Sequence, residues 1–487
     1  MTRSRKWKNL TIALAAILLV AVLGIGLFWW KFLKSEDQSF ADGTQRFEYG
    51  SLGGDAIAGI PYAIFMVLPR VFPDLVARYA TEGYGPEKAG FGGYGAFGLS
   101  WEEGQRLPIG LSIKRVGFER VTVTCALCHT TSYRLKAGDT PRFAVGGPAH
   151  TANVQGLIRF LIAASKDERF TAERLMPEVA LQFKLDGADW LLYSAVLIPK
   201  TRLALHLLED QVGWMNDRPA WGPGRDDAFN LPKFILTQSP WDHTIGNTDF
   251  PAVWGMGARR GQLLHWGGEA KTLYAVTATS ALGTGALPGK DFEEMAHWTD
   301  DFISALAPPR YPAPVDKELA SRGQAIFAAH CASCHDGKGS RVGTSIPLAE
   351  IGTDPEHVRT FSQTDADHMN TLTRLLGAPE AELQGAQGYV ARPLIGVWLL
   401  APYLHNGSVP TLRALLAPPD QRPKIFYRGV DLVDLADVGF SATGPAAEAE
   451  GFRFDTSLKG NGNGGHVYGT DLSEEDKTAL IEFLKTL

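Results

Sequence analysis

All four cysteines of this 487-residue chain fall in two copies of one motif, in which two cysteines stand three positions apart and a histidine follows at once. The two copies are Cys125-Ala-Leu-Cys128-His129 and Cys331-Ala-Ser-Cys334-His335. Two thiols at this spacing can each bond one vinyl group of a single porphyrin, and the adjacent histidine is then held beneath the iron as its proximal ligand. The motifs therefore predict two covalently attached haem c groups.

A zinc or redox site followed by a chance histidine would also place two cysteines at this spacing. A single copy of the motif would leave that alternative open. Two copies that together use every cysteine favour haem attachment, and they leave no thiol for a disulfide.

The chemistry of each haem depends on what lies opposite its proximal histidine. An iron with two protein ligands transfers electrons, whereas an iron with one open face can bind oxygen or peroxide. Of the 12 histidines, two are proximal ligands. Candidates for the second haem are His357, His368, Met369, His405 and His466, and those for the first are His150, His243 and His265.

The length of the chain predicts more than one domain, because a single hydrophobic core stops growing at roughly 250–300 residues. The 53 glycines and 29 prolines indicate many loops. We expect a mainly α protein with long irregular loops, in which an N-terminal transmembrane helix precedes two cytochrome c-like haem domains. The predicted divisions are an anchor at 1–34, a first haem domain at 35–306, a proline-rich linker at 307–316 and a C-terminal cytochrome c domain at 317–487.

In the first domain, apolar residues at helical spacing predict a helix over 154–162 that covers one side of the haem. A second helix is expected over 188–211, and Pro199 should kink or divide it. The irregular, tryptophan-containing segment 214–250 is expected to form a wall of the first haem pocket.

In the second domain, residues 317–330 should form a helix with Gly323 on one face. The last helix should begin at Ser473, which with Asp476 forms a capping box. Its apolar stripe would pack against Gly323, since a glycine lets another helix approach closely. In a small cytochrome c, the first and last helices cross beside the haem. The C-terminal half resembles such a cytochrome.

The N-terminal region carries basic residues and then an uncharged run from Thr11 to Trp30, which is long enough to span a bilayer. We expect an uncleaved anchor with its basic start in the cytoplasm. A cleaved signal ending near Ser39-Phe40-Ala41 is the alternative and would make the protein secreted. With the uncleaved anchor, the haem domains would lie on the periplasmic side of the bacterial inner membrane.

The net charge of the chain is −6, and it becomes −12 when the six cations of residues 1–34 are set aside. Such an acidic exterior disfavours nucleic acid and suits a basic redox protein as partner. A small-molecule oxidant is the other expected partner.

Two segments carry a family resemblance. The run Leu400-Ala-Pro-Tyr-Leu-His-Asn-Gly-Ser-Val-Pro-Thr-Leu412 resembles the corresponding run of bacterial di-haem cytochrome c peroxidases. The glycine-rich run Lys459-Gly-Asn-Gly-Asn-Gly-Gly-His-Val-Tyr-Gly-Thr470 resembles the C-terminal haem-ligand segment of the rubber (latex) oxygenases, a secreted branch of the same superfamily. This resemblance implies that His466 is the distal ligand of the second haem.

The same resemblance implies that the first haem has an accessible distal face that binds dioxygen. Phe229 would be the aromatic residue beside that face, and Arg225 would either donate hydrogen bonds to dioxygen or pair with Asp226 or Asp227. The chain is shorter than the rubber-cleaving enzymes and carries the expected anchor, which argues against activity on an extracellular polymer. No glutamate can be assigned as the peroxidase acid–base residue.

These features predict a redox enzyme, of peroxidase or oxygenase type, whose first haem activates dioxygen or peroxide while the second relays electrons. A membrane-anchored electron-transfer cytochrome with both irons six-coordinate is the main alternative. A third possibility is an oxidase that matures a partner protein, as does the di-haem enzyme that matures methylamine dehydrogenase.

Overall fold

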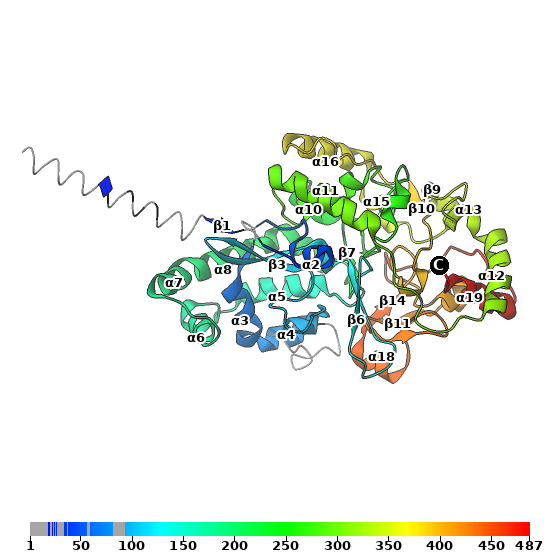
Figure 1. Ribbon diagram of the computed structural model, residues 1–487, viewed down its shortest axis with the longest axis horizontal. Coiled ribbons are helices and arrows are strands. Elements are labelled where there is room, and N and C mark those ends of the chain that lie inside the picture. The colour runs from blue at the N-terminus through cyan, green and yellow to red at the C-terminus, as the bar shows by residue number, and fades with distance from the viewer. Residues whose placement is uncertain are drawn as a thin grey trace, which may run out of the picture.

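The computed structural model describes residues 34–36, 38–55, 59–80 and 93–487, together with 18, 19, 22, 24 and 26. The expected N-terminal anchor therefore lies almost wholly outside the described residues. Among those described, helix predominates over strand and long irregular segments connect the elements. The N-terminal half occupies one end of an elongated body and the C-terminal half the other (Figure 1).

Short helices packed on a small antiparallel sheet form the N-terminal half. The sheet order is β1-β3-β4-β2, and the buried core beneath it is rich in phenylalanine. The strands are β1 Ser35–Glu36, β2 Ile60–Pro61, β3 Leu111–Val116 and β4 Phe118–Val123, followed by the hairpin β5 Thr130–Tyr133 and β6 Arg142–Val145. The helices are α2 Gly43–Gly50, α3 Tyr62–Val71, α4 Pro73–Tyr79, α5 Val154–Lys166 and α6 Ala172–Gln182.

The helix predicted over 154–162 is confirmed as α5, but it does not cover the first haem site. Leu157, Phe160 and Leu161 instead pack into the core of the N-terminal half, and none of the residues of α5 line the cavity that contains Cys125. Helical periodicity shows which face is apolar, but it does not show what that face meets.

A long helical stretch follows, as predicted over 188–211. It consists of α7 Gly187–Leu192, a π-helical turn η4 Tyr193–Leu197 and α8 Ile198–Val212. Pro199 stands in the first turn of α8, so the wider turn just before it accommodates the missing N–H. Among the described residues, the stretch 187–217 is long and apolar enough to cross a membrane, by length and composition alone.

The segment between α8 and the C-terminal half forms the middle of the molecule. It is irregular between short elements, and the residues 226–250 contribute much of one cavity wall, as expected for 214–250. Its elements are the turn η5 Gly213–Asp217, β7 Arg225–Asp226, α9 Asn230–Ile235, β8 Thr248–Asp249, the turn η6 Met256–Arg259, α10 Leu273–Gly283 and α11 Lys290–Ala305.

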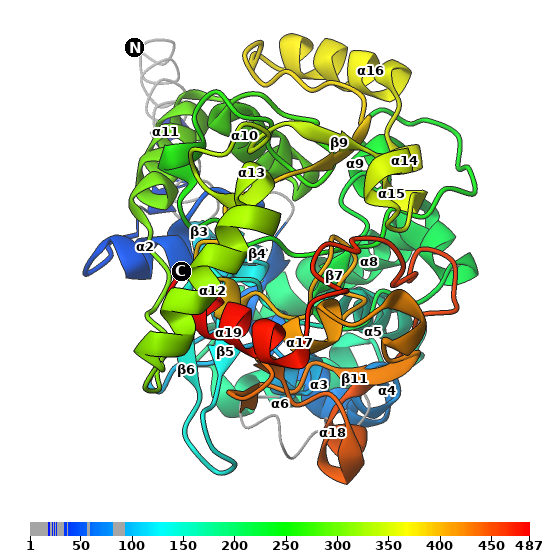
Figure 2. The ribbon, with the colours of Figure 1, turned by 90° about the vertical axis from the view of Figure 1, so that its right-hand side faces the viewer.

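In the C-terminal half, the first and last helices cross as predicted (Figure 2). A Cβ atom built on Gly323 of α12 (Lys317–His330) would lie 1.9 Å from the carbonyl oxygen of Ala479 in α19 (Glu474–Leu484), so only glycine fits. The hydroxyl of Ser473 caps α19 by accepting from the amide of Asp476, at 3.2 Å. The carboxylate of Asp476 in turn accepts from Arg322 of α12, which ties the two helices together.

The remaining C-terminal elements are short, and some of them, among them α13, α17 and β10, line a second cavity. The helices are α13 Ala332–His335, α14 Leu348–Ile351, α15 Glu356–Thr360, α16 Gln363–Leu375, α17 Leu412–Leu415 and α18 Gly444–Glu450. The strands pair as β9 Ser345–Pro347 with β10 Gly388–Val390, β11 Ile425–Arg428 with β14 Phe452–Asp455, and β12 Val433–Asp434 with β13 Gly439–Phe440.

The two halves interlock around buried charges. The guanidinium of Arg428 donates to the carboxylate of Asp249 at 2.6 Å and to the carbonyl of Pro223 at 3.1 Å. The proline-rich segment 307–316 has no helix or strand, and it is fixed to the C-terminal half because Trp398 donates to the carbonyl of Pro309 and Tyr311 donates to that of Leu435. The domain limits predicted on either side of this segment stay a prediction.

Candidate haem sites

Two cavities of nearly equal volume, about 260 and about 250 Å³, each contain one of the two cysteine–histidine motifs. Cys331, Cys334 and His335 line the first of these, and Cys125, Cys128 and His129 line the second. Both walls are mainly apolar. Two cavities of similar size and similar chemistry fit two groups of the same kind.

The proximal histidine of the C-terminal site is oriented for metal binding. Nδ1 of His335 lies 2.8 Å from the carbonyl oxygen of Arg392, which can only accept, so Nδ1 carries the proton and Nε2 is left to bind a metal. Burial lowers the pKa of His335 below its ordinary value. The side chain is therefore neutral at pH 7, as a ligand must be.

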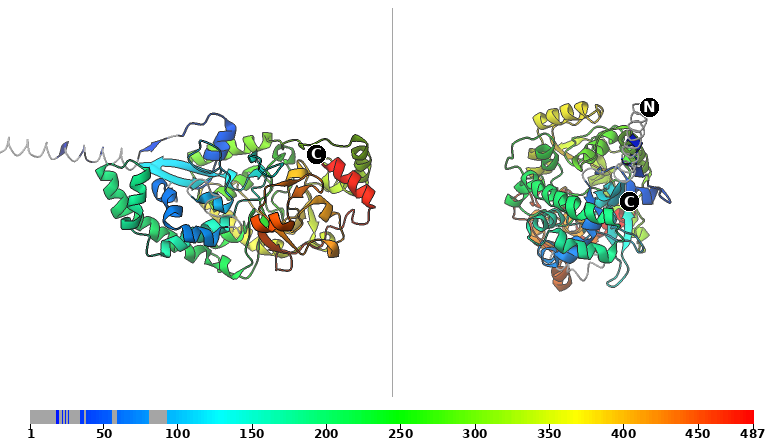
Figure 3. Two further views of the ribbon diagram at one scale, coloured as in Figure 1. Left: turned by 90° about the horizontal axis from the view of Figure 1, so that it is seen from below. Right: turned by 90° about the vertical axis from the view of Figure 1, so that its left-hand side faces the viewer.

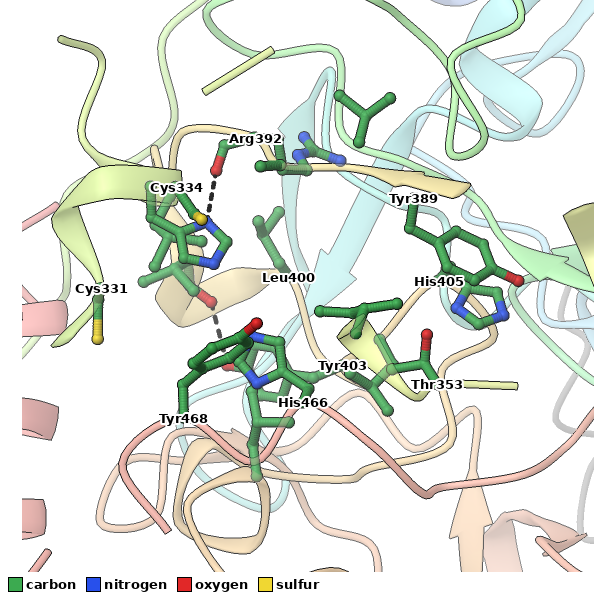
Figure 4. Close-up of a pocket in the computed structure, with 18 of the residues that line it drawn as sticks. Cys331, Cys334, Thr353, Tyr389, Arg392, Leu400, Tyr403, His405, His466 and Tyr468 are labelled. Atoms are coloured by element: carbon green, nitrogen blue, oxygen red, sulfur yellow. Dashed lines mark hydrogen bonds between the residues drawn. The ribbon is translucent and has the colours of Figure 1, made fainter. Parts of the chain in front are cut away.

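His466, the residue that the resemblance makes the distal ligand, lines the same cavity as His335. Figure 4 shows His466 beside Tyr468 in this cavity. The ring centroids of His335 and His466 are 6.1 Å apart. Two imidazoles on opposite sides of one iron, each with a metal–nitrogen bond of about 2 Å, have centroids roughly 6 Å apart. The spacing of this pair therefore fits a haem iron between them.

The loop that carries His466 has a strained backbone held by one buried arginine. His466 has φ +46° and Gly465 has φ +67°, the left-handed region that non-glycine residues seldom occupy. Arg422 is 2% exposed, and its guanidinium donates to five carbonyl groups. The acceptors are the carbonyls of Leu415, Ala417, Asn463, Gly465 and His466, at 2.6 to 3.2 Å. Arg422 therefore fixes the position of the predicted distal ligand.

The N-terminal site has a proximal histidine in the same arrangement. Nδ1 of His129 lies 2.8 Å from the carbonyl oxygen of Pro251, so Nε2 again remains for a metal. Burial lowers the pKa of His129 to about 4. Cys125 and Cys128 stand in the turn η3 (Cys125–Leu127) and just after it, next to this ring. The donor set fits a second haem c.

An aromatic side chain stands in the wall of the N-terminal cavity. Phe229 lines the cavity, as the resemblance implied, and its ring centroid lies 4.5 Å from that of Phe361. His265 and His357 also line the cavity and flank Phe229 at 5.6 and 5.7 Å. Phe361 and His357 come from the C-terminal half, so both halves build this site.

A buried carboxylate lies close to the two histidines of this wall. Glu269 is fully buried, and its Oε1 lies 3.5 Å from Nε2 of His357 while its Oε2 lies 4.0 Å from Nδ1 of His265. The other ring nitrogen of His357 faces the carbonyl of Gly246 at 3.4 Å. Nδ1 of His357 is thus held by the carbonyl of Gly246, whereas Nε2 of His357 and Nδ1 of His265 are buried near Glu269 without a hydrogen bond to any described residue.

Several of the other candidate ligands lie elsewhere. His150 is buried against Phe440, with ring centroids 3.7 Å apart, and it lines neither cavity. His243 is exposed. Met369, considered for the second haem, lines the cavity of the first, as does His357. Sequence position alone assigned these last two residues to the wrong cavity, because α15 and α16 extend over the N-terminal site.

The structure does not bring Arg225 to either cavity. It is fully buried, and its Nη1 donates to the side-chain oxygen of Asn461 at 2.9 Å. Asp227, one of the two expected partners, instead lies 3.7 Å from Arg218. Arg225 thus anchors the glycine-rich loop before His466 to β7, and this geometry gives no support to its expected contact with dioxygen.

A thin wall separates the two cavities. The residues that line both are Asp249, Phe250, Pro251, Ala252, Trp266, Val390 and Arg392. Pro251 and Arg392 provide the carbonyls bonded to the two proximal histidines. The guanidinium of Arg392 also donates to the carbonyl of Ala252 at 3.2 Å. Sequence analysis gave no indication of this wall, since its parts lie far apart in the chain.

Comparison with known proteins places the C-terminal half among c-type cytochromes. Residues 388–427 match the family described as RoxA-like, cytochrome c-like, and residues 318–390 match subunit III of cbb3-type cytochrome c oxidase. The chain is thus a c-type cytochrome related to the RoxA-like proteins. That relation implies covalently bound haem c and a haem-based role in electron transfer or redox chemistry.

Two proteins of Sinorhizobium fredii are similar to parts of the chain, and both are described as uncharacterised. One, y4iJ, is 30% identical, with 38% of this chain and 42% of that protein covered. The other, y4iM, is 32% identical, with 40% of this chain and 49% of that protein covered. The chain thus spans less than half the length of each of these relatives.

Proposed function

We propose that this protein is an exported two-haem c-type cytochrome that acts as an oxidoreductase. In this proposal the site at His129 is where dioxygen or peroxide reacts, and the site at His335 relays electrons to it. Haem c at the first site would supply the reductive chemistry on dioxygen or peroxide. The acidic exported part would receive electrons from a basic redox partner, on the periplasmic side of a membrane that residues 11–30 span.

The observation that carries the proposal is the difference between the walls of the two cavities. Across the C-terminal cavity, His466 faces His335 with ring centroids 6.1 Å apart. In the N-terminal cavity the wall contains Phe229 packed on Phe361, and Nδ1 of His357 faces the carbonyl of Gly246 while its Nε2 lies 3.5 Å from the carboxylate of Glu269. A site closed by two imidazoles suits electron storage, and a site with an aromatic wall suits a small ligand.

The side chains around the N-terminal cavity would do three things. Phe229 and Phe361 would exclude water from the reacting face, since both are buried. His265 would hold a proton at the cavity wall, which it lines, with the buried carboxylate of Glu269 behind it at 4.0 Å from Nδ1. The wall of Pro251, Ala252 and Arg392 would carry electrons between the sites. His265 is thus the candidate for the acid–base role for which sequence analysis found no glutamate.

The alternative function is electron transfer alone, with both irons six-coordinate. One observation favours it: His265 lines the N-terminal cavity, and its Nε2 is not directed at Glu269. Rotation of this ring toward the cavity centre would close the first site in the way that His466 closes the second.

Electron paramagnetic resonance of the full-length, haem-loaded protein separates the two functions. We expect one low-spin and one high-spin ferric signal, with cyanide converting the high-spin signal alone. The variant His466→Ala should turn the low-spin haem high-spin, whereas His265→Ala should leave the first haem high-spin.

Two low-spin signals that cyanide leaves unchanged would contradict the proposed enzyme. A high-spin signal that appears only in His265→Ala would then assign the electron-transfer function. The matched control is His243→Ala, which changes an exposed histidine outside both cavities and should alter neither signal.

A further inference from the structure

The helical stretch that begins with α7 exposes a row of large apolar side chains. Leu191 and Leu203 are 65% and 57% exposed, and three neighbours are also exposed. Large contiguous apolar patches on a protein surface mark sites of interaction. We define the α7–α8 face as Trp190, Leu191, Val196, Leu203 and Leu207.

The opposite side of η4 and α8 is fixed in the protein core, whereas none of the described residues of α7 is buried. The residues that alternate with the exposed ones, Tyr193, Leu197, Ile198 and Leu205, are buried in the core of the N-terminal half. Because η4 and α8 are packed on the core in this way, lipid cannot surround them, so the stretch 187–217 does not itself span a bilayer. The stretch can contact a membrane only through its exposed side, while lying along the membrane surface.

The position of the α7–α8 face relative to the N-terminal segment indicates what covers it. The carbonyl of Lys34 accepts from the amide of Gly117 at 2.9 Å, and the next residue, Phe118, contacts Tyr193 of the helical stretch, with ring centroids 6.5 Å apart. β1, which begins at Ser35, lies at the same end of the body as α7 and α8 (Figures 1 and 3).

Chain length then limits how far this end can be from a membrane. The uncharged run ends at Trp30, four residues before Lys34. Four extended residues reach at most about 14 Å. If the run spans a bilayer, the helical stretch beside Lys34 must lie close to the lipid surface.

We infer that the α7–α8 face docks on the phospholipid surface beside the N-terminal anchor, so that the protein is held at two places. Exposed charges around the face are of both signs, with Lys184 and Lys200 near Asp186 and Asp210. Docking therefore depends on apolar contact with the lipid interface and needs no anionic lipid. This inference rests on the N-terminal anchor of the proposed function and does not depend on the haem chemistry.

The test uses the full-length, haem-loaded chain with a protease site inserted between Leu33 and Lys34, reconstituted in phosphatidylcholine vesicles. After cleavage, flotation measures the fraction of residues 34–487 that stays with lipid, by haem absorbance. We expect the cleaved body to stay bound, with no change between low and high salt. The face variant Leu191→Gln/Leu203→Gln/Leu207→Gln should lower its lipid partition about tenfold or more.

A matched variant, Leu287→Gln/Leu375→Gln/Leu458→Gln, removes three exposed leucines elsewhere and should bind as the wild type does. Both variants should keep the wild-type haem spectrum, which shows that they fold. Flotation of the uncleaved chains tests the anchor separately from the face. The inference would be overturned if cleaved wild-type residues 34–487, whether monomeric or dimeric, were released from the phosphatidylcholine vesicles. It would also be overturned if the face variant and the matched variant lost lipid binding to the same extent.

Discussion

The two proximal histidines, His129 and His335, are joined by a short chain of bonds through the wall between the cavities. Nδ1 of His129 faces the carbonyl of Pro251, the next residue Ala252 accepts from the side chain of Arg392, and the carbonyl of Arg392 faces Nδ1 of His335. The three hydrogen bonds are 2.8, 3.2 and 2.8 Å long. Both predicted proximal ligands are thus held by the same wall.

Removing the arginine side chain from this wall should slow exchange of electrons between the two sites. Arg392→Met takes away the donor to Ala252 but keeps the backbone carbonyl that orients His335. We expect electron equilibration to be several-fold slower, measured by flash reduction, with both spin states unchanged. An unchanged rate would show that electrons pass elsewhere, with Trp266, which lines both cavities, as the next residue to test.

Loss of Arg422 should loosen the loop that presents His466. Arg422→Met leaves five carbonyl groups without their buried donor, which costs about 3 kcal/mol or more. Part of the second haem should become high-spin, detectable in the optical spectrum. Arg374→Met, at an exposed arginine, is the control and should leave both stability and spectrum unchanged.

Gly323 should tolerate no side chain. Alanine at this position would place Cβ against the carbonyl of Ala479, so α19 must move away from α12. We expect Gly323→Ala to lower the free energy of unfolding by about 1–3 kcal/mol, measured by denaturant titration. Gly187→Ala, where nothing lies within 4 Å of a built Cβ, should be neutral or slightly stabilising.

Stability should fall as pH falls from 6.5 toward 4, in part because of His150. Burial lowers its pKa to about 4 in the folded state, whereas the unfolded chain takes up a proton near pH 6.5. Protons therefore favour the unfolded state in this range, by about 2 kcal/mol at pH 5 for this residue. His150→Phe, which can still pack on Phe440, should show a smaller loss of stability between pH 7.5 and pH 5. An identical loss would assign the effect to other groups.

Sequence patterns were most informative where the deciding contacts are local. The helix of residues 317–330 and the cap at Ser473 follow from signals within one or two turns. Gly323 indicated a close helix approach, although its partner, Ala479, lies far along the chain. The family resemblance added His466 and Phe229, which both line the cavities to which it assigned them.

Residues whose roles depend on distant partners could not be identified in this way. Arg422 and Glu269 act through carbonyls and rings contributed by loops far apart in the chain, and no spacing indicates them. Arg225 has the right chemistry for a ligand contact, but the fold directs it to Asn461. His357 lies in the C-terminal half and yet lines the N-terminal cavity.

The fastening of the proline-rich segment has a kinetic consequence. Trp398 donates to the carbonyl of Pro309 and Tyr311 donates to that of Leu435, and Arg428 joins the two halves through Asp249. The two halves therefore cannot swing apart as tethered domains do. The distance between the two haem sites is then fixed. Their exchange of electrons should not respond to solvent viscosity, in contrast to cytochromes whose mobile domains must first come together.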